Sequence, residues 1–134
     1  MAIFMKVQTK SGPLPGDCKL QNRTGWFDVQ SAQKMRDSLS DDWSFRSISI
    51  ELAVTPSALK FLPLVTNGEQ LDWLVVEFEL SQTSIHHWLL EGVNVPSMAQ
   101  IGGPPEGIAL DFVASNYTGA RNGRWPRAKV PGAG

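Results

Sequence analysis

The sequence predicts a mainly β protein, an antiparallel β-barrel of two packed sheets with one short α-helix. Several segments alternate apolar and polar residues with a period of two, which is typical of strands that bury one face. Only residues 55–68 carry apolar residues at helical spacing. One helix is too few to connect parallel strands by crossovers, so the strands are expected to pair antiparallel in a barrel or sandwich.

The first strand is expected at residues 3–7, a short run rich in branched and aromatic side chains. Residues 9–23 then contain repeated glycine and proline, which interrupt regular structure, and they are predicted to form a long loop. A loop of this length without its own secondary structure is usually functional or disordered. The interrupting residues are Gly12, Pro13, Pro15 and Gly16.

A second strand is predicted at residues 24–30, where Phe27 and Val29 share one face. The polar residues 31–42 are assigned to a loop. Residues 47–54 show the clearest alternation in the chain, so one face of this third strand is expected to be buried. The residues on that face are Ile48, Ile50, Leu52 and Val54.

The helix is expected to start at Thr55 and Pro56, because threonine can cap free amides and proline is favoured at the first helical position. Asn67 and Gly68 supply a stop signal. Pro63 lacks an amide and crowds the preceding turn, so the helix is predicted to kink or end near this residue.

Three further strands are predicted in the second half of the chain. Residues 71–80 alternate, with an apolar face ending at Leu80. A polar turn at residues 81–84 leads into a strand at residues 85–95. Residues 96–107 contain a double glycine followed by a double proline, and they are assigned to a loop. The last strand is expected at residues 108–114, after which the chain becomes polar and glycine-rich.

The composition indicates one globular domain. The chain has 134 residues, of which 42% are hydrophobic and 19% are charged. The net charge of -1 does not indicate nucleic acid or an anionic membrane as a partner, and no segment is long and apolar enough to span a bilayer. Residues 121–134 contain four basic residues and no acidic one. We therefore divide the chain into a barrel domain, residues 1–120, and a basic tail, residues 121–134.

The sequence predicts no catalytic residue, no cofactor site and no metal site. Cys18 is the only cysteine, so an internal disulfide is impossible, and it is interpreted as an unpaired loop thiol. His86 and His87 are adjacent on a strand, where they point to opposite faces and cannot chelate one ion together. Glu77 and Glu79 are interpreted as solvated surface charge. The N-terminus lacks a secretory signal peptide, so synthesis and folding in the cytoplasm are expected.

In order and spacing, four parts of the chain resemble the Hcp family, whose members form the tube of the bacterial type VI secretion system. Together they cover roughly residues 1–118. The resemblance departs at residues 32–36, which replace an aromatic-glycine segment, at Pro63 and at the basic tail. These departures suggest a divergent branch, such as the tube protein of a related contractile injection system or phage-tail-like particle. The similar parts are an N-terminal strand (3–7), a Gly-Trp-apolar-acidic-apolar strand (25–29), a short helix ending in glycine before an alternating strand (57–80), and a strand, glycine-rich loop and strand (88–113).

The resemblance implies a structural protein, not an enzyme. It implies hexameric rings that stack into a tube, with other copies of the chain and the sheath, spike and effector proteins as partners. It also implies secretion without a cleaved signal peptide. An alternative is a small β-barrel adaptor or chaperone that binds an effector without forming tubes, and an enzyme is the least supported class. The resemblance implies that a loop contacts the adjacent ring, and the candidate residues are Ser11, Gly12, Pro13, Leu14, Pro15, Gly16 and Asp17. We also expect the basic tail to contact another molecule, through Arg121, Arg124, Trp125, Arg127 and Lys129.

Overall fold

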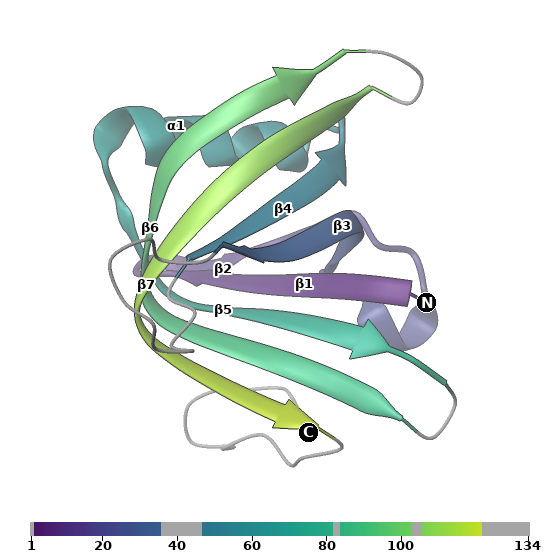
Figure 1. The fold of residues 1–134 in the computed structure, drawn as a ribbon. Helices are drawn as coiled ribbons and strands as arrows, with labels where there is room; N and C mark the ends of the chain where they lie inside the picture. Colours follow the sequence, from purple (N-terminus) through teal and green to yellow (C-terminus); the bar gives the residue numbers. More distant parts are fainter. Residues whose placement is uncertain (1, 36–46, 82–83, 103–105, 122–134) are drawn as a thin grey trace.

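Seven antiparallel strands and a short helix make up the part of the chain that the computed structural model describes, which is residues 2–35, 47–81, 84–102 and 106–121 (Figure 1). The helix α1 spans Phe61–Asn67, and two 3-10 turns lie at Gln21–Arg23 and Ala58–Lys60. The strands are β1 (Ala2–Thr9), β2 (Gly12–Leu14), β3 (Phe27–Met35), β4 (Ser47–Ala53), β5 (Gln70–Glu79), β6 (Ile85–Ile101) and β7 (Gly107–Arg121).

The strands form one continuous sheet that closes on itself. Their order is β2-β1-β3-β4-β7-β6-β5, and β5 also pairs with β1, so six strands complete a ring and β2 is an addition at its edge. β1 pairs with β5 along its whole length, whereas its other edge is shared by β3 at residues 3–5 and β2 at residues 7–9. This arrangement confirms the predicted antiparallel barrel with a single short α-helix.

The apolar residues of the alternating segments point into the barrel, and the residues between them point outward. The inward residues of β4 and β7 are at most 3% exposed and join one large apolar core with residues from every other barrel strand. Phe61 of α1 belongs to this core, with its ring centroid 5.3 Å from that of Phe27 and 5.8 Å from that of Phe112. Two residues predicted on buried faces are instead exposed, because Val54 and Leu80 lie just beyond the last paired residue of β4 and β5.

The predicted end of the helix at Asn67 and Gly68 is confirmed, but the predicted start at Thr55 and Pro56 is wrong, because a 3-10 turn at Ala58–Lys60 comes first and α1 begins only at Phe61. Thr55 accepts a hydrogen bond from the backbone amide of Ala58 through its hydroxyl oxygen, at 3.1 Å. Gly68 ends α1 in the left-handed conformation, with φ 65°, which favours glycine. The helix does not end at Pro63 but continues to Asn67. A 3-10 turn precedes it, and Pro63 is the third residue of α1, where an amide has no intrahelical acceptor to lose.

Several segments predicted as loops are strands in the structure. Residues 31–35 extend β3, because they pair with β4, while residues 36–42 of that predicted loop lie outside the described residues. β6 continues past Pro96 to Ile101, since a bulge between Asn94 and Ser97 removes the proline from the ladder. β7 continues to Arg121 along β6. In each case a neighbouring strand supplies the hydrogen bonds that the local composition does not indicate.

Candidate functional site: a strap held by an ion pair

Residues 15–26, which we call the strap, cover part of the outer surface of the barrel. They contribute Cys18 and Trp26 to a second apolar cluster that is separate from the barrel core. The barrel contributes outward-facing residues of β1, β5 and β6, which stand on the opposite parity to the core residues. The strap therefore turns one outer face of the sheet into a small second core, whose barrel members are Phe4, Trp73, Val75 and Leu89.

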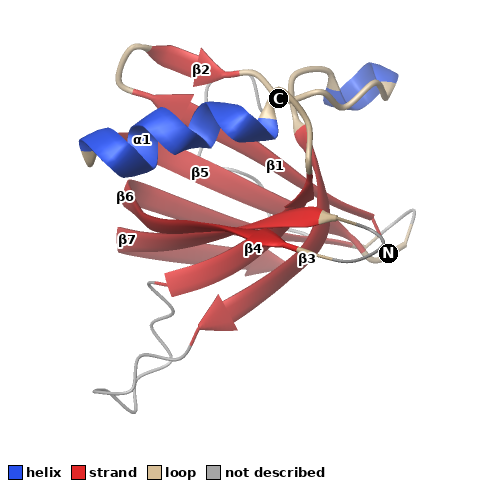
Figure 2. Ribbon diagram, turned by 90° about the horizontal axis from the view of Figure 1, so that it is seen from above, coloured by secondary structure: helices blue, strands red, loops and turns tan. Residues whose placement is uncertain are grey.

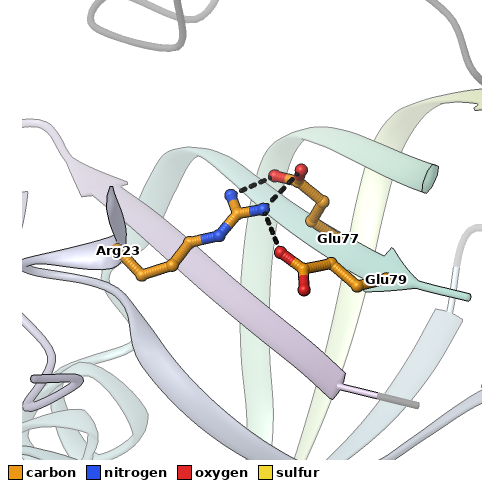
Figure 3. A network of polar contacts seen from close by, with 3 residues as sticks. All are labelled: Arg23, Glu77 and Glu79. Atoms are coloured by element: carbon orange, nitrogen blue, oxygen red, sulfur yellow. Dashed lines mark hydrogen bonds and ion pairs between the residues drawn. The ribbon is translucent and has the colours of Figure 1, made fainter. Parts of the chain in front are cut away.

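Arg23, in the 3-10 turn of the strap, points onto this face and binds two carboxylates of β5 (Figure 3). Its two terminal nitrogens donate to the two carboxylate oxygens of Glu77, at 2.7 and 2.8 Å. One of them also donates to Glu79, at 2.9 Å. The guanidinium carbon lies 4.8 Å from the centroid of the Phe4 ring and 4.9 Å from that of the Trp26 ring. Arg23 is thus enclosed by two aromatic rings and two carboxylates.

Arg23 keeps its positive charge although it is largely removed from water. Burial lowers the pKa of Arg23, but the hydrogen bonds and charges of Glu77 and Glu79 outweigh burial and raise that pKa above its ordinary value. The side chains of Arg23 and Glu77 are only 10% and 7% exposed. A bidentate, desolvated pair of this kind orients both partners, and the loss of either partner would leave an uncompensated buried charge.

The structure corrects our interpretation of Glu77 and Glu79 as solvated charge. They do point away from the barrel core, as their position in the alternation predicts. Glu77, however, is 5% exposed, and it lies opposite Phe4 on β1 and His87 on β6, beneath the strap. Sequence reasoning missed Arg23 as their partner. The available signal was two carboxylates two residues apart on one strand face, which require a cation when another segment covers them.

The predicted stacking loop, residues 11–17, is not an unstructured loop. Its residues 12–14 are strand β2, which pairs with residues 7–9 of β1. Beyond β2, Gly16 donates from its amide to the carbonyl of Gly25, and Cys18 donates to the carbonyl of Trp26, both at 2.9 Å. The side chains alternate between outward and inward positions, and the exposed members are Ser11, Pro13, Pro15 and Asp17.

The other residues considered in the sequence are dispersed. Cys18 is buried in the second cluster, where burial raises the pKa of its thiol. His86 lies opposite Phe78 and His87 opposite Glu77, so the two histidines are on different faces of β6. Within the described ranges no group of three or more metal-ligating side chains is found. The predicted intermolecular tail begins at Arg121, the last residue of β7, and Arg124, Trp125, Arg127 and Lys129 lie outside the described residues.

Two surface depressions lie away from the strap. A polar pocket of about 500 Å³ is formed by the β1–β2 turn (9–11) and the residues that connect α1 to β5 (67–70). An apolar groove of about 220 Å³ lies beside α1 and is lined by Val54, Leu59, Leu62, Met98, Gln100 and Ile108. Leu59 and Leu62 are about half exposed there, at 49% and 50%. Figure 2 shows α1, which contains Leu62, lying along one side of the sheet, and Leu59 belongs to the 3-10 turn before it.

The described part of the chain is a closed six-stranded antiparallel barrel with one added strand and a short helix, and this fold is shared by solved structures. The fold is that of the Hcp proteins. A double variant of Hcp1 from the E. coli EAEC 042 pathovar superposes with a TM-score of 0.74 at 14% identity, over 90% of this chain and 91% of the other. The secreted protein Hcp3 from Pseudomonas aeruginosa superposes with a TM-score of 0.70 at 12% identity, over 90% of this chain and 95% of the other. A type VI secretion system effector from Yersinia pestis superposes with a TM-score of 0.67 at 10% identity, over 89% of this chain and 97% of the other.

No protein family model matches the sequence, and no curated protein matches it. The resemblance that the sequence predicted is confirmed as a shared Hcp fold over nearly the whole chain. In the described residues no helix reaches the length and apolarity that a membrane crossing requires.

Proposed function

We propose that this protein is a structural tube subunit of a type VI secretion system or a related contractile injection system. Six copies would form a ring, and rings would stack into a hollow tube. The observation that carries the proposal is the fold, which matches Hcp structures over about 90% of this chain and a similar share of theirs. The proposal assigns no catalytic residue to the chain. Its partners would be other copies of the chain and the sheath, spike and effector proteins of such a machine.

Two strand edges that lack a neighbouring strand among the described residues support a ring made from identical copies. Within the described part of the chain, residues 97–101 of β6 pair only with β7, and residues 114–121 of β7 pair only with β6. The two edges lie on opposite sides of the β6–β7 hairpin, whose upper end in Figure 1 reaches beyond the other strands. A closed ring needs head-to-tail contacts between two different surfaces of the same chain, and a strand edge without a neighbouring strand favours such a contact.

Light scattering on the main chromatographic peak, followed by negative-stain imaging, tests the proposal. The expected result is a mass of six chains and a particle with a central hole, with stacks at higher protein concentration. A single-chain mass at every concentration, with no ring in the images, would refute the tube subunit. A single chain that binds an effector in equal stoichiometry would instead support the adaptor alternative.

A further inference from the structure

The segment 11–26 is attached to the barrel at two independent places. Its first part is held by the ladder between β2 and β1. Its second part makes no barrel ladder, and it is held by Arg23 on Glu77 and Glu79 and by the apolar cluster beneath it. The backbone amides of Gly16 and Cys18 donate hydrogen bonds to the carbonyls of residues 25 and 26. These two hydrogen bonds connect the exposed residues of the segment to the residues that follow Arg23. The position of Pro15 and Asp17 therefore depends on the second attachment.

We infer that Arg23 is a positioning residue that fixes the strap, and with it the exposed surface at Pro15 and Asp17, against the barrel before any partner binds. The consequence for ring stacking rests on the proposed function. The closure of the strap itself does not, because it concerns contacts within one chain. The partner of the positioned surface would be a second copy of this chain in the adjacent ring.

The geometry favours positioning over incidental surface pairing. Exposed ion pairs contribute little, because both partners are well solvated and lose side-chain freedom on pairing. Here the cation is enclosed by the Phe4 and Trp26 rings, and its planar fork matches both oxygens of Glu77. Such an arrangement permits few orientations of the strap. A surface that is already ordered binds without the conformational entropy cost of ordering a loop.

Cys18 provides a direct readout of strap closure. It is the only cysteine in the chain, it is 5% exposed, and it lies in the cluster between the strap and the sheet. A thiol reagent can reach it only when the strap opens or the whole chain unfolds. The rate of modification by a soluble disulfide reagent in folded protein therefore measures how often the strap is open.

The first experiment compares this rate in Arg23→Gln, Glu79→Gln and the wild-type protein, with Lys19→Gln as the control. Lys19 is an exposed cation of the same strap, so its replacement changes the charge equally without touching the ion pair. We expect modification to be roughly tenfold faster or more in Arg23→Gln. A smaller increase is expected in Glu79→Gln, whose neutral amide removes the charge from one of the three bonds, and no change in Lys19→Gln. Circular dichroism checks that each variant is folded, and Glu79→Gln keeps the test decisive where Arg23→Gln does not fold.

Folded Arg23 and Glu79 variants whose Cys18 reacts at the wild-type rate would overturn the inference. The second experiment images the same proteins. If the wild type forms rings and stacks, folded Arg23→Gln is expected to keep rings and lose stacks, while Lys19→Gln keeps both. Unchanged stacking in an Arg23→Gln protein with fast thiol modification would refute the stacking role. Absence of rings in the wild type would count against the proposed function alone, since the thiol rates still decide whether Arg23 holds the strap.

Discussion

Gly16 packs against the main chain of residues 26 and 27, so that a side chain at this position would meet backbone atoms that cannot move independently. An added methyl group would contact the carbonyl of Trp26 and lie 2.6 Å from the amide nitrogen of Phe27. We expect Gly16→Ala to lower the free energy of unfolding by about 1–3 kcal/mol, the usual cost of forcing extra volume into a packed site. Chemical denaturation measures this change.

Gly102→Ala is the matched control for this substitution. Gly102 is exposed and has no atom within 4 Å of an added methyl group. We expect its replacement to change stability by less than about 0.5 kcal/mol. Equal effects of the two substitutions would contradict the close approach of the strap to itself at Gly16.

Because of the thiol of Cys18, the free energy of unfolding is expected to depend on pH in the alkaline range. Burial raises the pKa of Cys18, the backbone at Leu20 opposes this rise, and Asp28 adds to it. Because the folded state holds the thiol proton more tightly than the unfolded state, the contribution of Cys18 to stability is complete below the ordinary thiol pKa. It declines as pH rises from that value through the raised one.

Denaturation of the wild type and of Cys18→Ala across this pH range measures the effect. The difference in unfolding free energy between the two proteins is expected to be constant at neutral pH and to shrink at alkaline pH. The variant corrects for the titration of lysine and tyrosine, which both proteins share. A difference that stays constant up to high pH would show that Cys18 is not shielded by the strap.

Residue identities in the sequence predicted part of this site. The single thiol and the opposite faces of His86 and His87 follow from counting and from strand geometry. Arg23 could not be identified as the partner of Glu77, because the two are 54 positions apart and meet only when the strap folds over β5. Sequence patterns report local periodicity, and they do not report which distant charge fills a position.

At the scale of secondary structure, the cap that Thr55 provides for the 3-10 turn before α1 can be tested directly. Thr55→Ala removes the oxygen that accepts the Ala58 amide, so we expect a loss of about 1 kcal/mol in unfolding free energy. Thr66→Ala is the control, because the hydroxyl of Thr66 donates back to carbonyls of its own helix and caps no free amide. Thermal denaturation compares the two, and a loss in Thr66→Ala equal to that in Thr55→Ala would argue against the cap.

Strand positions were predicted better than strand lengths. The centres of β1, β4, β5, β6 and β7 fall in the predicted strands, whereas the centre of β3, Ser31, falls in the polar segment that was assigned to a loop. β6 and β7 extend well beyond the predicted strands, because each long strand is hydrogen-bonded to the other over Gly107–Arg121. β2 was not predicted at all, since Gly12 and Pro13 disfavour a strand and only the edge of β1 makes it possible.

At the scale of the whole molecule, the division between barrel and tail predicts how a shortened chain behaves. A chain that ends at Arg121 keeps every residue of the β6–β7 ladder and loses the basic residues 124, 127 and 129. We expect its melting temperature to be unchanged. If the tail binds the acidic body of another subunit, the shortened chain would also self-associate more weakly and with less dependence on salt.

Thermal melting and light scattering at low and high salt measure both effects. A large fall in melting temperature would place the tail in the barrel fold and contradict the division at residue 120. Unchanged self-association at both salt concentrations would show that the tail makes no intermolecular contact that contributes to assembly.

The sequence by itself determined the fold class, the single short helix with its end at Gly68, the capping role of Thr55 ahead of that helix, and the inward faces of the strands. These depend on local periodicity and on the backbone preferences of threonine, proline and glycine, all of which can be read within a few residues. Only the tertiary structure decided that β1 and β5 close the barrel, that β2 joins its edge, and that Arg23 holds the strap on Glu77. Each of these contacts joins segments far apart in the chain, and its free energy arises when burial excludes water from both partners at once.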